Sequence, residues 1–282
     1  MERSQIEIPT QNGHDTRTGD GGIRYCIKCG KPIEKIIDFP AFDGSGAVVR
    51  RKVHVLCDCE KKEREEKKKR QEYREKQLRI QQLRTISLMD SRLYSAKLSN
   101  FAVDDQNRRV YGIASRYVNN WELMKKNHQG LLFYGDVGTG KSFTAAVIAN
   151  ELMDRLHPVI MTSFIKLLAD AKGKKFDENG DTINRLNEAA LLVIDDLGAE
   201  RSTDYAIEMV YNVIDGRYRS GKPIILTTNL SLDEMKAEKD IRYSRIYDRI
   251  FEMCYPVKFT GLSWRKREAS HHYQEMKKIL EG

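Results

Sequence analysis

The stretch Gly135-Asp-Val-Gly-Thr-Gly-Lys-Ser142 decides the fold of this chain, because it matches the phosphate-binding loop pattern G-x-x-x-x-G-K-[ST]. Glycines let backbone N–H groups turn inward around phosphates, Lys141 adds a positive charge, and the Ser142 hydroxyl can ligate Mg²⁺. An apolar run over 131–134 precedes the motif, and an alanine-rich aliphatic stretch over 145–149 follows it, as a strand–loop–helix site requires. The alternative is a chance glycine-rich turn. The predicted nucleotide contacts are Gly135, Asp136, Val137, Gly138, Thr139, Gly140, Lys141 and Ser142.

Strand and helix patterns alternate from about residue 99 to the end of the chain. Between the strands the spacing is helical, as for Ile207, Val210, Tyr211 and Ile214. Such alternation predicts an α/β domain with a parallel sheet covered by helices on both faces. Apolar runs predict strands at 131–134, 159–162, 191–195, 224–228 and 257–260.

Polar residues follow two of these apolar strands. Asp195 and Asp196 end the run that begins at Leu191, and Asn229 follows Thr228. Asp195 is predicted to hold Mg²⁺, and Asp196 to polarise the water that attacks the nucleotide. Asn229, on a strand lying between the other two, is predicted to sense the terminal phosphate. The alternatives are an ordinary acidic turn for the aspartates and a helix cap for Asn229.

The composition indicates an intracellular protein with an affinity for nucleic acid. The 282 residues include 49 Lys and Arg against 41 Asp and Glu, a basic balance typical of nucleic-acid partners but also of an inert basic surface. No apolar stretch is long enough to cross a bilayer, and the polar N-terminus lacks the apolar region of a signal peptide. We therefore expect a cytoplasmic protein whose five cysteines are not structural disulfides.

The part of the chain before residue 99 contains three segments of different amino-acid composition. Residues 1–22 are polar and predicted to be a disordered lead-in. Residues 23–59 carry cysteines and strand-like runs and are predicted to form a small zinc-binding module. Residues 60–98 are predicted to be a linker, beginning with a charged helix supported by i,i+4 ion pairs.

Four cysteines in the small module have the arrangement of a metal site. Cys26 and Cys29 form a C-x-x-C pair, and Cys57 and Cys59 form a C-x-C pair. Four thiolates in a reducing compartment predict a tetrahedral, structural Zn²⁺ site. His54 is an alternative to one of the second pair, and buried thiols or a redox pair are alternatives to the metal site.

The order of the motifs resembles the DnaC/DnaI-type helicase loaders, a branch of the AAA+ ATPases that includes the related IstB-type transposition helpers. The resemblance covers about residues 95–275. It rests on the phosphate loop, the acidic pair followed by Leu197-Gly198, the Thr-Thr-Asn run ending at Asn229, Ser244-Arg-Ile-Tyr-Asp-Arg249 and Gly261-Leu-Ser-Trp-Arg265.

The resemblance implies a site completed between subunits. Arg245 corresponds to an arginine finger that acts on the ATP of a neighbouring subunit, and Arg265 to a sensor arginine that contacts the terminal phosphate within the subunit. Asp196 stands where the wider AAA+ pattern has glutamate, which implies slow, switch-like hydrolysis. ATP, Mg²⁺ and Zn²⁺ are the implied cofactors.

The resemblance also implies single-stranded DNA and the replicative helicase as partners, with self-association in the ATP state. The zinc module is expected to dock on the helicase. The expected function is ATP-dependent helicase loading during replication initiation. The alternatives are an IstB-like transposition helper and a DNA-binding adaptor that does not hydrolyse ATP. Basic and aromatic chemistry suits DNA, and the candidate DNA contacts are Lys174, Lys175, Phe176, Thr203 and Tyr205.

Overall fold

The computed structural model describes residues 15–41, 46, 48–86, 93–171, 176–200 and 203–281. The chain divides into two compact units, Met1–Glu75 and Lys76–Gly282, and each is described by itself. Within the described residues, no helix is both long and apolar enough to cross a membrane.

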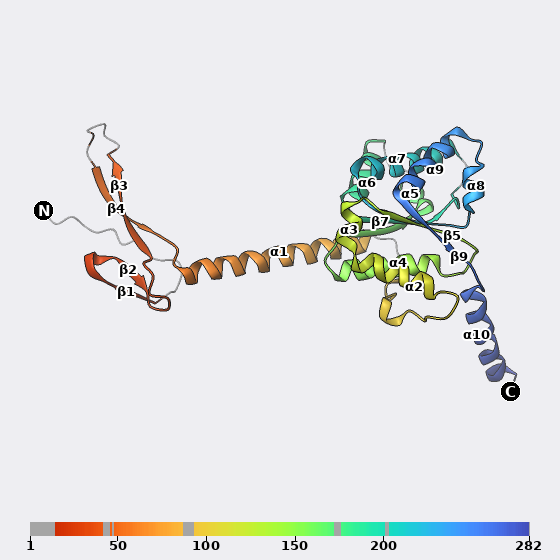
Figure 1. Cartoon of the computed structure of the whole chain (residues 1–282), viewed down its shortest axis with the longest axis horizontal. Coiled ribbons are helices and arrows are strands. Elements are labelled where there is room, and N and C mark those ends of the chain that lie inside the picture. Colours follow the sequence, from red (N-terminus) through yellow and green to blue (C-terminus); the bar gives the residue numbers. More distant parts are fainter. Residues whose placement is uncertain are drawn as a thin grey trace. The chain divides into compact units, whose positions relative to one another are not determined.

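The first unit contains two antiparallel hairpins and the beginning of a long helix (Figure 1). Its strands are β1 (Thr16–Thr18), β2 (Arg24–Cys26), β3 (Glu34–Pro40) and β4 (Val48–His54), with a short 3-10 helix at Asp20–Gly22. β1 pairs with β2, and β3 pairs with β4. The prediction of a disordered lead-in over 1–22 is therefore wrong for residues 16–18, because backbone pairing with β2 orders this short polar segment.

Helix α1 (Asp58–Ile86) is continuous and mostly solvent-facing in its charged part. The ion pairs Lys67–Glu63 and Lys68–Glu72 support it at i,i+4 spacing. Its C-terminal turns differ, because Ile80 and the next turn's Leu83 are buried in the core of the second unit. The end of the predicted linker therefore belongs structurally to the following domain.

The second unit is an α/β domain built on a five-stranded parallel sheet with the order β6-β7-β8-β5-β9. The strands are β5 (Gly130–Gly135), β6 (Val159–Ser163), β7 (Leu191–Leu197), β8 (Ile224–Thr228) and β9 (Cys254–Phe259). All four neighbouring pairs are parallel. This arrangement confirms the predicted fold class and places β8 between the phosphate-loop strand and the acidic strand.

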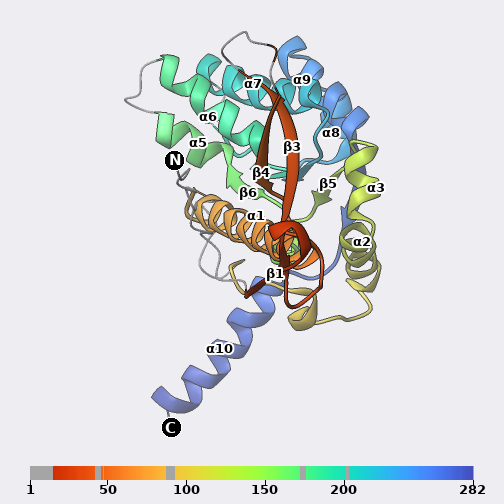
Figure 2. The same ribbon diagram turned by 90° about the vertical axis from the view of Figure 1, so that its left-hand side faces the viewer.

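Helices cover both faces of the sheet, as Figures 1 and 2 show. The helices are α2 (Arg108–Asn119), α3 (Trp121–Lys126), α4 (Lys141–Asp154), α5 (Phe164–Ala171), α6 (Phe176–Glu188), α7 (Asp204–Ser220), α8 (Leu232–Lys236), α9 (Ile241–Met253) and α10 (Trp264–Leu280), with a 3-10 turn at Leu98–Asn100. Alternate residues of β7 face opposite cores: Val193 packs with α2 and α4, whereas Leu192 packs with α5, α7 and α9. Beyond its first turns α10 projects away from the domain (Figure 2).

Candidate nucleotide-binding site and cysteine cluster

The phosphate-binding loop joins the end of β5 to the start of α4. Its residues Gly135, Gly138 and Gly140 have φ values of 120°, 81° and 96°, which residues with a Cβ adopt at a cost. A Cβ on Gly135 would lie 2.2 Å from the carbonyl oxygen of Phe259 in β9. Glycine is required here both by the backbone conformation and by the close approach of the neighbouring strand.

Lys141 begins α4 and is almost buried, with 5% of its surface exposed. Its Nζ donates to the carbonyl oxygens of Gly135 at 2.8 Å and Asp136 at 2.7 Å, and Thr139 Oγ1 donates to the same Asp136 carbonyl at 2.7 Å. Burial lowers the pKa of Lys141, against the opposing charge of Asp196. These bonds hold the ammonium group inside the loop, where the P-loop motif places the phosphates.

The start of α10 packs directly on this loop. The backbone N–H of Trp264 donates to the carbonyl oxygen of Gly138 at 2.9 Å. Ser263 is the N-cap of α10, and its Oγ accepts the N–H of Lys266. Because a Cβ on Gly138 would lie 2.2 Å from Ser263 Oγ, the loop and the helix fit together only with glycine at this position.

The two acidic residues lie at the end of β7, beside β8. Thr227 Oγ1 donates to Asp195 Oδ1 at 2.6 Å and accepts the backbone N–H of Asp196 at 2.9 Å. Asp196 has a φ of 56°, and the pairing register with β8 shifts between Ile194 and Leu197. The bulge places Asp196 outside the regular ladder. Sequence reasoning missed Thr227, although the polar run at the end of its strand was a signal.

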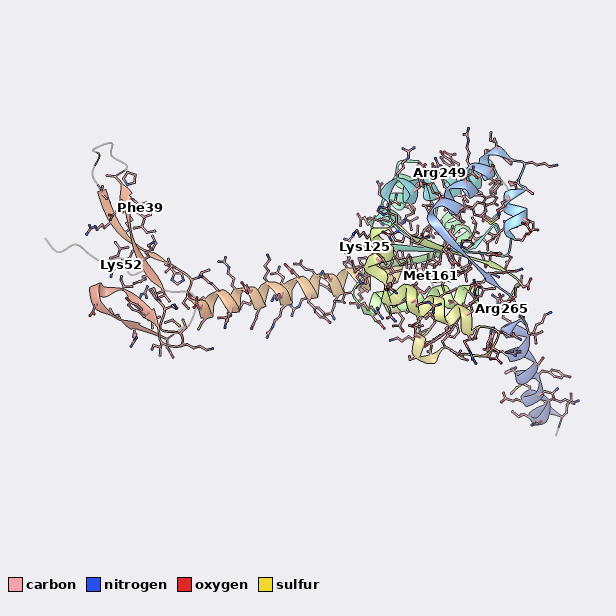
Figure 3. All side chains as sticks on the ribbon, in the orientation of Figure 1. Phe39, Lys52, Lys125, Met161, Arg249 and Arg265 are labelled. Atoms are coloured by element: carbon pink, nitrogen blue, oxygen red, sulfur yellow. The ribbon has the colours of Figure 1, made fainter. Side chains whose placement is uncertain are left out.

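Charges from three elements meet at this edge of the sheet. Burial is the main cause that raises the pKa of Asp196, and Asp195 raises it further, whereas the positive charges of Lys141 and Arg265 lower it. Arg265, in the first turn of α10 (Figure 3), also acts electrostatically on Lys141. The fold thus brings the predicted loop lysine, acidic pair and sensor arginine into one electrostatic neighbourhood.

Asn229 is exposed just beyond β8, between the strands that carry the loop and the acidic pair. The alternative role as a helix cap is wrong, because Ser231 is the N-cap of α8. Ser231 Oγ accepts the N–H of Glu234 at 3.2 Å, and Glu234 Oε2 accepts the N–H of Ser231 at 2.7 Å. The structure therefore leaves Asn229 at the edge where the sensing role was predicted.

The arginines of α9 have different surroundings. Arg249, labelled in Figure 3, is 2.8 Å from Asp215 Oδ1, and its guanidinium lies 4.7 Å from the centroid of the Tyr211 ring. Arg242 forms ion pairs within the domain. Arg245 is exposed, although it lies only four residues before Arg249. Arg249 therefore packs α9 on α7, whereas Arg245 is exposed, and its role as an arginine finger remains a prediction.

The candidate DNA contacts receive uneven support. Lys174 and Lys175 lie outside the described residues, and Phe176 is the first residue of α6. Thr203 is the N-cap of α7, and its Oγ1 accepts the N–H of Ala206 at 3.2 Å. Tyr205 is 44% exposed, so the alternative that Tyr205 packs in the core is wrong. Binding of DNA by these residues remains a prediction.

A surface pocket beside the loop was not foreseen from the sequence. It lies between the start of α2 and the start of α10, which Gln106 Oε1 ties together by accepting the N–H of Leu262 at 3.2 Å. Since these segments are far apart in the chain, no local pattern identifies the pocket. Its lining includes Gln106, Val110, Thr139, Phe259, Leu262 and Trp264.

The four predicted zinc ligands come together in the first unit. All four cysteine thiols are free, and the sulfurs of Cys26, Cys29, Cys57 and Cys59 lie within 4.8 Å of one another. This spacing fits tetrahedral Zn²⁺, whose Zn–S bonds of about 2.3 Å place the sulfurs roughly 3.8 Å apart. The cluster also provides most of the small core of this unit.

The cysteines of the cluster have different surroundings, which shift the pKa values of the Cys29 and Cys57 thiols in opposite directions. The backbone N–H of Lys31 is the main cause that lowers the pKa of Cys29 to about 6, whereas burial raises that of Cys57 to about 12.

His54 Nε2 lies 3.3 Å from Glu60 Oε1, outside the group of four sulfurs. Glu60 also accepts the N–H of Cys57 at 3.0 Å and so steadies the second pair.

The parallel sheet, the phosphate loop and the acidic strand together define a P-loop ATP-binding domain of the AAA+ class. The profile of the family described as "IstB-like ATP binding protein" matches residues 46–272, and the chain belongs to this family. The family membership confirms the resemblance inferred from the motifs.

Three comparisons place the chain within the family. It is 35% identical over 154 residues to the phage-like element PBSX protein XkdC of Bacillus subtilis (strain 168), covering 51% of this chain and 55% of that protein. It is 26% identical over 144 residues to the replicative helicase loader DnaI of the same organism, covering 47% and 46%. The crystal structure of DnaI superposes with a TM-score of 0.53 at 26% identity, covering 61% of this chain and 95% of that one. The chain spans about half the length of these curated relatives.

Proposed function

We propose that this chain is an ATP-switched loader that binds a replicative DNA helicase and single-stranded DNA during replication initiation. The observation that supports the proposal is that the positive charges of Lys141 and Arg265 both act on Asp196, while Arg245 is exposed on α9. The relative DnaI is described as a replicative helicase loader. We expect the protein to work in the cytoplasm.

Within one subunit, the loop N–H groups and the Lys141 ammonium bind the phosphates. Mg²⁺, held by Ser142 and Asp195, would neutralise phosphate charge when bound. Asp196 accepts a proton from the attacking water, and Asn229 orients that water. Arg265 contacts the terminal phosphate and so links α10 to the state of the nucleotide.

Between subunits, Arg245 reaches the nucleotide of a neighbour and stabilises the charge that develops on the terminal phosphate. The site is then complete only in an assembly, so ATP favours assembly and slow hydrolysis, stimulated by DNA or the helicase, favours release. Single-stranded DNA lies along residues of α6 and α7, with Tyr205 offering a surface for base stacking.

The cysteine cluster holds the first unit together around Zn²⁺, and this unit grips the helicase. Four sulfur ligands leave no open position for substrate, so the metal is structural. The core of this unit is too small to fold without such a crosslink.

The decisive experiment is co-purification of the full chain with a replicative helicase, with and without ATP, with zinc measured in the same sample. We expect ATP-dependent capture and one zinc per chain. Lys141→Ala is expected to bind ATP at least tenfold more weakly and to lose ATP-dependent loading. Full loading by Lys141→Ala would exclude the mechanism, and Glu122→Gln, at an exposed position on α3, is the matched control.

A second candidate is an IstB-like transposition helper acting on duplex DNA, which the family description favours. The cysteine module argues for the loader, because a helicase-docking unit explains it better. A pull-down that offers helicase and transposase in competition separates the two. A DNA-binding adaptor without hydrolysis is the third candidate, and absence of DNA-stimulated hydrolysis in a purified oligomer would support it.

A further inference from the structure

Glu200 is a buried carboxyl group that none of the roles described above uses. It is 7% exposed and lies shortly after the acidic pair, between β7 and α7. Its Oε2 accepts the backbone N–H of Gly198 at 2.9 Å. Its Oε1 is buried and has no hydrogen-bond partner among the described residues. Burying a carboxyl group with one oxygen unpaired costs free energy.

The bond from Glu200 secures the turn that contains Asp196. The N–H of Ala199 donates to the carbonyl oxygen of Asp196 at 3.2 Å, closing the turn, and Gly198 within it has a φ of 90°. Asp196 itself has a φ of 56°. A residue with a side chain keeps such a conformation only where its surroundings hold it there. Thr227 holds the N–H side of Asp196, and Glu200 holds the far end of the turn.

The same turn lies against the helix that carries Arg245. After burial, the charge of Glu200 is a cause that raises the pKa of Tyr243, and it also contributes at Tyr247, so both α9 tyrosines lie near the carboxyl group. Just beyond the turn, Asp204 at the start of α7 pairs with Arg242 of α9 at 2.6 Å. Glu200 and the start of α7 therefore lie near α9.

We propose that Glu200 is a positioning residue that holds Asp196 in the geometry needed for ATP hydrolysis, acting through the turn at 196–199. The inference rests on the proposed function for its effect on hydrolysis, but not for its effect on the turn. Glu200 does not contact the nucleotide, so its loss should change the rate of the chemical step and leave binding intact.

Two substitutions separate this role from simple packing. Glu200→Gln keeps an oxygen that can accept the Gly198 N–H, so we expect kcat within about twofold of wild type. Glu200→Ala removes the acceptor, and because a misplaced group beside the reacting atoms costs one to two orders of magnitude, kcat should fall about tenfold or more. The dissociation constant of ATP should change by less than about twofold. Glu122→Gln, at an exposed position on α3, is the matched control.

The test measures kcat and ATP affinity of the full chain, with hydrogen–deuterium exchange of the peptide covering 196–200. Glu200→Ala should exchange at least tenfold faster in this peptide than wild type, Glu200→Gln or Glu122→Gln. Unchanged exchange and kcat in Glu200→Ala, or Glu200→Gln behaving like Glu200→Ala, would overturn the inference. Equal losses of ATP affinity and kcat would do the same. If wild type hydrolyses ATP no faster than Lys141→Ala, the proposed function fails, while the exchange comparison still decides whether Glu200 holds the turn.

Discussion

Replacing Gly138 with alanine should destabilise the ATPase unit by about 2–5 kcal/mol, because two costs coincide at this position. Its φ of 81° costs a residue with a Cβ about 1–2 kcal/mol. The new Cβ would lie 2.2 Å from Ser263 Oγ and 3.0 Å from Ser263 Cβ, and such overpacking adds about 1–3 kcal/mol. Gly140→Ala isolates the first cost, since its φ is 96° but its nearest neighbour is Trp264 Cδ1 at 3.9 Å.

Denaturant unfolding followed by tryptophan fluorescence measures both variants, because Trp121 and Trp264, the two tryptophans of the chain, lie in this unit. Ser263→Ala alone should cost about 1 kcal/mol through loss of the α10 cap. Combined with Gly138→Ala it also removes the closest clash, so the double variant should be about 1 kcal/mol more stable than additivity predicts. Combined with Gly140→Ala it should be additive within about 0.5 kcal/mol. Equal losses at the two glycines, or the same additivity in both cycles, would refute the packing of α10 on the loop.

Three further predictions concern the rest of the chain. Arg249→Ala should lower the free energy of unfolding by about 1–2 kcal/mol, because Asp215 loses the more buried of its two arginine partners and keeps only Arg219, and because the contact with the Tyr211 ring is lost, whereas Arg245→Ala should change it by less than about 0.5 kcal/mol; similar values for both would contradict the division of roles. Cys57→Ser should lose the zinc and unfold the first unit while the tryptophan transition persists, as metal analysis and limited proteolysis can check; zinc retained at wild-type stoichiometry would exclude the four-sulfur site. Burial, followed by Asp195, raises the pKa of Asp196 above its usual 3.8; since the deprotonated form is needed, kcat/KM, which reports the free protein, should fall with decreasing pH from above the ordinary aspartate range, and an acid limb at or below 3.8 would contradict this.

Most strands of the second unit were predicted correctly from the sequence. The run Ile224–Thr228 is the strand β8 with the same bounds, and the other predicted strands differ from the observed ones by a few residues at their ends. Buried parallel strands require continuous apolar side chains, so their positions are encoded locally. The phosphate loop and the cysteine pairs could also be identified from the sequence, because their chemistry depends on fixed spacing between residues.

Other features have no local signal. Thr16–Thr18 becomes a strand through pairing with β2, although its side chains are polar. Ile80 is buried because the end of α1 meets a core built by residues far along the chain. The charged residues around Ile80 predicted a solvent-exposed linker. Composition alone does not show which turn of a helix packs against another part of the chain.

The motifs alone specified which chemistry is present: a phosphate loop, two aspartates, candidate arginines and four thiols. These motifs can be recognised from sequence because residues at fixed, short spacing are held close together by the local backbone conformation. The tertiary structure determined which of these residues are buried and which are exposed. Arg245 and Arg249 are the same residue type one helical turn apart, yet one is exposed and the other is packed against Tyr211. Glu200 is an ordinary acid in the sequence and a buried one in the fold. Burial and electrostatic environment are set by contacts between distant segments, so they exist only once the chain has folded.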